Sequence, residues 1–189
     1  MALQKKETWK MKKWFSVYAS SEFNTALIGE MPANDDEAAM GRSIVVSLDA
    51  LTHNPSHAYT NVKFKITGVN GTTASTKLVA MEQLYSYIRS LVRKYRSVAT
   101  LVQNVQTKDG VKMVVKLLII TRQRATARKI VGIRKEATEM VKGYFLENNA
   151  SAIVAAILEG KFQSDLASRL GHIAQLNKIE VRKLEVTQA

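Results

Sequence analysis

The chain has 189 residues, of which 28 are Lys or Arg and 16 are Asp or Glu, and its formal net charge is +12 at pH 7. It contains no cysteine, which excludes disulfide frameworks, thiol catalysis and cysteine-based zinc sites. Hydrophobic residues make up 46% of the chain without a run long enough to span a membrane, so we expect a soluble, intracellular, strongly basic globular protein.

The positive charge is concentrated in the middle of the chain. Residues 83–135 include thirteen Lys or Arg and a single acid, Asp109, whereas basic and acidic residues balance over the rest of the chain. A surface that is charged only for solubility carries both signs interspersed. We therefore expect a polyanion as the binding partner.

The N-terminal third is expected to contain an arm and short strands. Residues 1–12 are polar and rich in lysine, which predicts a flexible basic arm that becomes ordered on a partner. Residues 13–19 alternate in polarity and predict a strand. We further expect a loop at 31–36, a short buried strand at 43–48 and a turn at 52–56.

The clearest local unit is a β-hairpin. Residues 62–67 alternate between apolar and polar, which predicts a strand with one buried face. Asn70-Gly71 follows, the preferred pair for a type I′ turn, because both central positions of that turn need a positive φ. Residues 72–80 form the predicted partner strand.

A second hairpin is predicted farther along the chain. Its strands cover 98–106 and 111–121, and Lys108-Asp109-Gly110 closes the turn between them. The second strand is so apolar that we expect it to be central in the sheet.

An amphipathic helix is predicted over 81–95, between the hairpins. Its apolar residues recur at three- and four-residue spacing and would form the buried stripe: Met81, Leu84, Ile88, Leu91, Val92 and Tyr95. Arg89, Arg93 and Arg96 would share one flank of this helix, suited to bidentate contacts with phosphates. The alternative is that these arginines serve the fold, through ion pairs with acids of the preceding segment such as Glu22, Glu30 and Asp49.

The remainder is predicted to be helical until the last strand. The core stripe of the first helix would be Ile133, Ala137, Met140, Val141 and Tyr144. A second helix over 150–159 would end at Gly160, and Ser164 would cap a third. In the final strand, 178–186, the apolar phase changes between Val181 and Leu184, which predicts a β-bulge.

The predicted fold class is α+β. We expect a mostly antiparallel β-sheet or barrel-like core, an amphipathic helix between the hairpins, and a C-terminal helical segment packed beside the core. The β core would comprise 13–121 and 178–186 and the helical part 122–176, within one domain over 13–189.

The sequence contains no recognisable catalytic or metal-binding pattern. His53 and His57 are four residues apart, as two ligands on a helix would be, but Asn54-Pro55 between them favours a turn. A phosphate-binding glycine loop and a nucleophile elbow are also missing. We therefore expect neither enzyme activity, nor a cofactor, nor a metal site.

Short motifs along residues 12–186 occur in the order and at the spacing of a known family. They are Lys12-Lys13-Trp14-Phe15 with Val17, Phe23, Ile28-Gly29-Glu30, Gly41-Arg42, Ser47-Leu48 with Leu51-Thr52, Val69-Asn70-Gly71, Arg89-Ser90-Leu91-Val92-Arg93, Thr107-Lys108-Asp109-Gly110, Thr121 with Arg124-Ala125, Ile133-Arg134-Lys135, and Ile179-Glu180-Val181-Arg182-Lys183. Together they resemble the small-subunit ribosomal protein family called S-three-Ae in archaea and S-three-a in eukaryotes. The chain departs from the family pattern at Ala19-Ser20, Ala127-Arg128-Lys129 and Ala174-Gln175. It ends without the eukaryotic extension, so we expect an archaeal-type member.

The resemblance implies a structural ribosomal protein that is cytoplasmic, ribosome-bound and not an enzyme. It would bind small-subunit rRNA on the platform side, near the mRNA exit, beside neighbouring small-subunit ribosomal proteins and with mRNA as a further partner; a membrane partner is not expected. A free-standing basic nucleic-acid-binding protein is the alternative, because it fits the charge equally well. The candidate RNA-binding residues are Lys5, Lys6, Lys10, Lys12, Lys13, Arg89, Arg93, Lys94, Arg96, Arg122, Arg124, Arg128, Lys129, Arg134, Lys135, Arg182 and Lys183.

Overall fold

The computed structural model describes residues 12–188, in which one sheet of eight strands is accompanied by six α-helices. The strands are β1 (Lys13–Tyr18), β2 (Leu27–Ala33), β3 (Ser43–Ser47), β4 (Thr60–Asn70), β5 (Thr73–Gln83), β6 (Val98–Gln106), β7 (Lys112–Thr121) and β8 (Leu176–Gln188). The helices are α1 (Asp36–Ala39), α2 (Leu48–Thr52), α3 (Tyr85–Leu91), α4 (Ala127–Glu147), α5 (Ala150–Leu158) and α6 (Lys161–Leu170).

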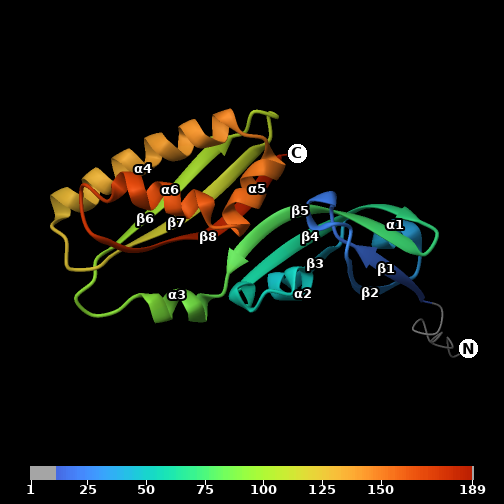
Figure 1. The fold of residues 1–189 in the computed structure, drawn as a ribbon. Coiled ribbons are helices and arrows are strands. Elements are labelled where there is room, and N and C mark those ends of the chain that lie inside the picture. The colour runs from blue at the N-terminus through green and yellow to red at the C-terminus, as the bar shows by residue number, and fades with distance from the viewer. Residues whose placement is uncertain (1–11, 189) are drawn as a thin grey trace, which may run out of the picture.

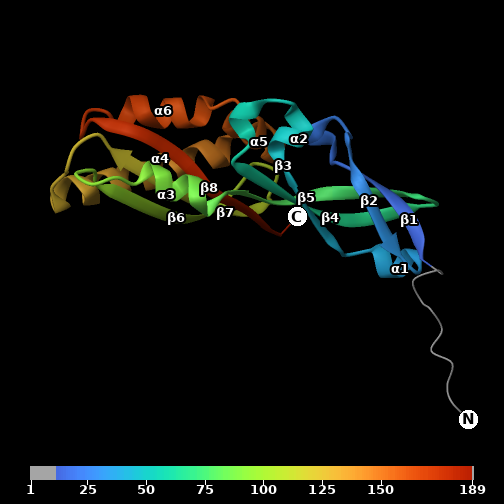
Figure 2. The ribbon, with the colours of Figure 1, turned by 90° about the horizontal axis from the view of Figure 1, so that it is seen from below.

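The sheet is open and elongated, and β5 joins its two halves. The strand order is β2-β1-β5-β8-β7-β6, with β3 and β4 attached to β5, and every pairing is antiparallel except β1 with β5. One end of β5 pairs with β1 and the other end with β8, so β1–β5 lie at one end of the molecule and β6–β8 with α4–α6 at the other (Figure 1). Figure 2 shows the same extended outline from below. The predicted α+β class with a mostly antiparallel sheet is confirmed.

The strand β7 is buried on both faces, as its apolar sequence predicts. Leu117 and Ile119 belong to the main core, which includes Ile133 of α4. The alternate residues Leu118 and Ile120 contact Ile88 of α3 instead. Because successive side chains of a strand point to opposite faces, α3 and α4 cover opposite faces of this half of the sheet (Figure 1).

Several local predictions are confirmed. Both hairpins form, β1 covers the predicted first strand, and α4 and α5 lie where the periodicity places them. The predicted bulge in β8 is also present: Lys183 pairs with Lys116 of β7, but Val181 pairs with the next residue, Leu117, so that Arg182 is the extra residue.

The first hairpin has a different turn from the one predicted. Asn70 pairs with Thr73, so that Gly71 and Thr72 are the central residues, and of these only Gly71 has a positive φ, 59°. A type I′ turn needs a positive φ at both central positions, whereas type II′ needs it only at the first. The predicted type I′ turn is therefore wrong, and the glycine serves as the first residue of the loop.

The predicted strand at 43–48 forms as β3, but its predicted burial, the predicted loop at 31–36 and the predicted simple turn at 52–56 are wrong. The predicted loop begins inside β2, where Pro32 lies opposite Trp14 and is tolerated because β2 is an edge strand. The predicted buried strand, β3, is also an edge strand, and Val45 is 58% exposed. Residues 48–57 form α2 and a 3₁₀ turn (Pro55–His57) instead of a simple turn.

The helix predicted over 81–95 is much shorter. The residues Ala80–Glu82 pair with β4 on one side and β8 on the other, so that β5 continues to Gln83 and α3 covers only Tyr85–Leu91. Hydrogen bonding within the sheet overrides the helical periodicity at this point. Of the predicted apolar stripe, Met81 and Ile88 are buried, while Tyr95 is 72% exposed.

The third C-terminal helix begins earlier than predicted. Gly160, with a φ of 76°, directly precedes α6, and Ser164 lies inside that helix, where its N–H donates to the Gly160 carbonyl oxygen at 3.0 Å. The predicted Ser164 cap is therefore wrong. Leu166 and Leu170 are buried as predicted.

Candidate nucleic-acid interface

Hydrogen bonds of Thr121 and Ser97 hold the loop that carries Arg122 and Arg124. Thr121 is 2% exposed; its hydroxyl accepts from the Ser97 N–H at 3.0 Å and donates to the Gln123 carbonyl oxygen at 2.6 Å. The Ser97 hydroxyl accepts from the Ala125 N–H at 3.0 Å. The two arginines themselves are exposed. A rigid loop therefore presents both guanidinium groups to solvent.

The exposed side of α4 continues this basic surface. Arg128, Lys129, Arg134 and Lys135 are all exposed, while Ile133 on the opposite side of the helix is fully buried. These positions agree with the sequence prediction, since a core stripe on one side of a helix leaves the other side to polar residues.

Lys142 extends the same surface and was missed by the sequence reasoning. It is exposed and follows Lys135 by seven residues, as Lys135 follows Arg128. Residues seven apart lie on one side of a helix, about 10.5 Å from one another along its axis. This heptad spacing was the signal that could have found Lys142. We call Arg122, Arg124, Arg128, Lys129, Arg134, Lys135 and Lys142 the α4 basic surface.

The cations of the α4 basic surface outnumber the acids that lie among them in the helix, Glu136 and Glu139. Within residues 12–188, none of its seven cations makes an ion pair with a side chain of the protein. The first turn of α4 contains no acid, and the Thr126 side chain makes no capping hydrogen bond. The positive end of the helix dipole therefore adds to the charge of Arg128 and Lys129. An anion such as a phosphate is favoured at this place.

The single acid of the basic segment has a structural role. A carboxylate oxygen of Asp109, in the β6–β7 turn, accepts from the Ala150 N–H at the start of α5, 2.9 Å away. The Lys108 N–H donates to the Asn148 carbonyl oxygen at 3.2 Å. The turn thus caps a helix distant in sequence, and Asp109 does not interrupt the basic surface.

The three arginines predicted to share a flank of a long helix do not do so. Arg89 lies in the last turn of α3, whereas Arg93 and Arg96 follow the helix end. Arg89 and Arg93 are exposed and Arg96 is half-buried. In the described part of the chain, none of them forms an ion pair with an acid, so the alternative in which they serve the fold through salt bridges is not supported.

Of the two candidates in β8, Lys183 is engaged within the sheet. Its ammonium group lies 2.7 Å from Glu185 and 3.1 Å from Glu82, and hydrogen bonds to these two carboxylates raise the pKa of Lys183. The pKa of Glu185 is lowered, mainly by its hydrogen bond from Lys183. Arg182, the bulge residue, is exposed. Lys183 is therefore charged but already neutralised by two carboxylates, whereas Arg182 is exposed to a phosphate.

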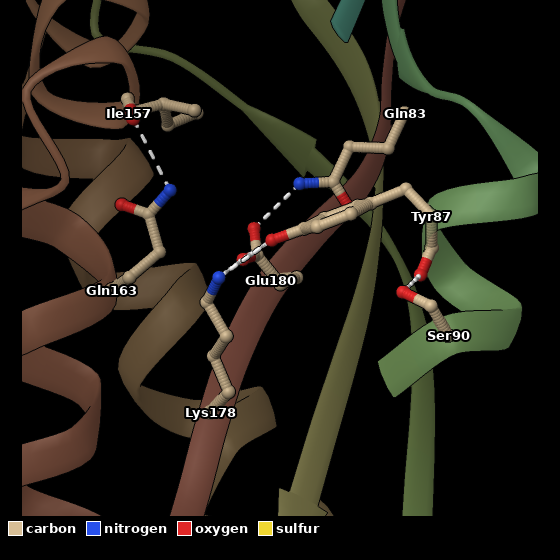
Figure 3. A network of polar contacts seen from close by, with 7 residues as sticks. All are labelled: Gln83, Tyr87, Ser90, Ile157, Gln163, Lys178 and Glu180. Carbon is tan, nitrogen blue, oxygen red and sulfur yellow. Dashed lines mark hydrogen bonds and ion pairs between the residues drawn. The ribbon is translucent and has the colours of Figure 1, made fainter. Parts of the chain in front are cut away.

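A polar network fixes α3 to β8 (Figure 3). The buried carboxylate of Glu180 accepts from Gln83, from the Tyr87 hydroxyl at 2.9 Å and from Lys178 at 2.7 Å, and Lys178 also donates to the Tyr87 hydroxyl. Burial raises the pKa of Tyr87, and Glu180 raises it further. Burial acts to lower the pKa of Lys178, but the hydrogen bonds to Glu180 and Tyr87 outweigh it, so that this pKa is raised. The sequence reasoning missed this network because its members are distant in the chain.

The remaining candidates belong to the N-terminal segment. Lys5, Lys6 and Lys10 lie outside the described residues, as does the predicted arm except for its last residue, Lys12. Lys12 is half-buried, and Lys13, the first residue of β1, is exposed.

Metal binding and membrane crossing are two further properties that bear on function. Over residues 12–188 there is no group of three or more His, Asp or Glu side chains that could hold a metal ion. None of the helices in this range has both the length and the apolar character that crossing a membrane requires.

Comparison with known proteins places the chain in a family. Residues 2–189 match the model of the Ribosomal S3Ae family. The chain is 36% identical to small ribosomal subunit protein eS1 of Pyrobaculum aerophilum over 98% of its length and 84% of that protein's. It is 34% identical to the eS1 protein of Methanococcus vannielii over 97% of its length and 83% of that protein's length. It is 33% identical to the eS1 protein of Methanococcus maripaludis over 97% of its length and 82% of that protein's length. These relatives are archaeal ribosomal proteins, a structural class rather than an enzyme class. A basic surface on an α+β fold and a match over nearly the whole sequence lead to one conclusion: the chain belongs to the Ribosomal S3Ae family.

Proposed function

We propose that this protein is a structural constituent of the small ribosomal subunit and that it binds ribosomal RNA through the α4 basic surface. The observation that carries the proposal is that seven exposed cations on one loop and one helix have no acidic partner in residues 12–188. The relatives' name, small ribosomal subunit protein, supports ribosomal RNA as the polyanion. The protein would act in the cytoplasm as part of the ribosome, on the platform side near the mRNA exit.

The mechanism of binding is the replacement of counterions. Phosphates of folded RNA hold a layer of condensed cations, and each Lys or Arg that contacts a phosphate releases some of them. The hydrogen bonds of Thr121 and Ser97 hold the loop with Arg122 and Arg124 in place before binding, which reduces the conformational entropy that is lost on association. Because backbone phosphates carry no sequence information, the surface would recognise the shape of the RNA.

The proposal includes the organisation of the chain. The β part and the helical part would act as one domain, since β5 pairs with β8 and the main core includes residues of both parts. The lysine-rich segment 1–12 would be an arm that orders on RNA, because backbone phosphates could offset the chain entropy lost on ordering.

A salt titration tests the electrostatic part of the proposal. If about six cations contact phosphates, log K for a structured RNA should fall with log salt concentration at a slope of roughly −4 to −5. The triple variant Arg128→Gln, Lys135→Gln, Lys142→Gln should make the slope less steep by about 2 to 3. The exposed lysines Lys65 and Lys77 of the first hairpin, both changed to Gln, provide a control. A wild-type slope near zero would contradict the proposal.

Sedimentation distinguishes a ribosomal constituent from a free-standing nucleic-acid-binding protein. In a sucrose gradient of cell lysate, the wild-type protein should migrate with small subunits and remain there after moderate salt washing. The triple Gln variant should shift toward the top of the gradient. A wild-type protein found mainly at the top, together with RNA binding in the titration, would favour the free-standing alternative.

A further inference from the structure

The surface around α3 differs chemically from the α4 basic surface. Tyr85 and Tyr95 are 61% and 72% exposed, and each has a cation over its ring: the Arg89 guanidinium carbon lies 5.1 Å from the Tyr85 centroid, and the Lys94 ammonium lies 5.2 Å from the Tyr95 centroid. By contrast, the aromatic residues of α4, Tyr144 and Phe145, pack against Phe162 of α6. We call Tyr85, Arg89, Arg93, Lys94 and Tyr95 the tyrosine surface.

We propose that the tyrosine surface binds single-stranded RNA by base stacking. The inference rests on the proposed RNA-binding function and adds to it a second ligand class on a second face. Proteins that hold single strands combine a cationic track for the backbone with aromatic rings on which successive bases stack. Residues 85–97 supply both, since they include four cations and two exposed tyrosines, while Glu82 and Glu185, which line a pocket together with Tyr85, are paired with Lys183.

The cation on each ring increases its suitability for stacking. A cation over one face of a tyrosine orients the ring and is itself attracted by the ring quadrupole. With exposures of 61% and 72%, each ring still presents a large area to solvent. A base that stacks there would lie beside a positive charge, which its own phosphate can contact.

The backbone at Tyr95, in the loop after α3, has a left-handed conformation. Its φ is 66°, in the left-handed region, which a bulky residue rarely adopts. Such conformations have a free-energy cost and are found preferentially at binding sites. Tyr95 is the third residue of a turn in which the Arg96 N–H donates to the Arg93 carbonyl oxygen at 3.3 Å, and its side chain gains no burial in that turn.

The helix α3, which carries Tyr85 and Arg89, is firmly attached to the sheet on the side opposite to α4. Ile88 of α3 packs on Leu118 and Ile120 of β7, and Tyr87 is fixed to Glu180 of β8 (Figures 1 and 3). Because α3 and α4 cover opposite faces of the sheet, one protein molecule could hold folded RNA at α4 and a single strand at α3.

The chemistry favours a single strand over a duplex and over a protein. In a duplex the bases already stack on each other, so that tyrosine rings cannot stack on them. Tyrosine and arginine are also common in protein interfaces. A protein partner, however, would have to be acidic to neutralise the three cations of the tyrosine surface, and RNA supplies that charge together with flat rings.

The test compares two RNA probes on the full chain. The probes are an unstructured RNA of about twelve nucleotides and a duplex of the same length, and binding is followed by fluorescence anisotropy. The variant is Tyr85→Leu with Tyr95→Asn, because Asn tolerates a positive φ. Tyr18→Leu is the matched control, since Tyr18 is an exposed tyrosine of β1 and makes no cation–ring contact with any residue of 12–188.

We expect the double variant to bind the single strand about 10- to 100-fold more weakly and the duplex within about twofold of wild type. Ultraviolet cross-linking of wild type to the single strand should label peptides that contain Tyr85 or Tyr95. Equal losses on both probes, or none on the single strand, would overturn the inference. Unchanged RNA affinity with reduced incorporation into small subunits would overturn it too, and would assign the surface to a protein neighbour. The duplex arm tests the proposed function separately, since a wild type that fails to bind the duplex contradicts only that proposal.

Discussion

Replacing Arg128 and Lys129 by Glu should stabilise the protein and weaken its binding to RNA. Both residues lie in the first turn of α4, both are exposed, and neither has an ion-pair partner in the described part of the chain. An acid in the first turn of a helix is favourable by about 0.3–1 kcal/mol, whereas a cation there gains nothing from the helix dipole. The double replacement should therefore raise the free energy of unfolding by about 1–2 kcal/mol at low salt.

For a chain of this size, that gain corresponds to an increase in Tm of about 2–8 °C, because 1 kcal/mol shifts Tm by about 2–4 °C. The increase should shrink as salt screens the helix dipole. In the RNA assay, the loss of two phosphate contacts should make the slope of log K against log salt less steep by about 2. Differential scanning calorimetry and a salt titration measure the two effects on the same samples.

The control for this prediction is the pair Lys65→Glu and Lys77→Glu. Lys65 and Lys77 are exposed and lie directly opposite each other on β4 and β5, so that the net charge changes equally while two like charges remain neighbours. RNA affinity that falls equally in the control would mean that only net charge matters. A lower Tm for the α4 variant would show that Arg128 and Lys129 stabilise the fold, which would refute the reasoning.

Three further predictions concern stability. Asp109→Ala should lower the free energy of unfolding by about 1 kcal/mol, because the Ala150 N–H loses its acceptor, and Asp109→Asn should lower it less, as thermal unfolding can measure. The free energy of unfolding of the wild type should fall as the pH rises from about 10, because the raised pKa values of Tyr87 and Lys178 favour protonation in the folded state. Denaturant titrations between pH 8 and 11 should show a smaller fall for Tyr87→Phe. An equal fall in that variant would contradict the role of the network. Ile88→Ala should cost about 2–5 kcal/mol and Leu91→Ala less in urea denaturation, because Ile88 is 6% exposed and Leu91 is only half-buried.

The sequence by itself determined those elements whose signals are local. The alternation in β4, the continuous apolar run of β7 and the phase change in β8 each predicted the right structure, because side-chain direction along a strand has a fixed period of two. The apolar spacing of α4 was equally clear in the sequence, and it correctly placed Arg128 and Lys135 on the exposed side of the helix. The family followed from short motifs whose order and spacing the sequence displays directly.

Only the tertiary structure decided where α3 begins and ends, and therefore which side chains form the tyrosine surface. Residues 81–95 have helical periodicity, but β8 lies beside β5 and extends that strand to Gln83. This pairing joins residues about a hundred positions apart, which a local pattern cannot contain. The helix that remains is too short to align Arg89, Arg93 and Arg96, and Tyr95 therefore lies in solvent instead of the core. Long-range hydrogen bonds within the sheet outweigh local propensity, because a sheet leaves few of its buried backbone groups unpaired.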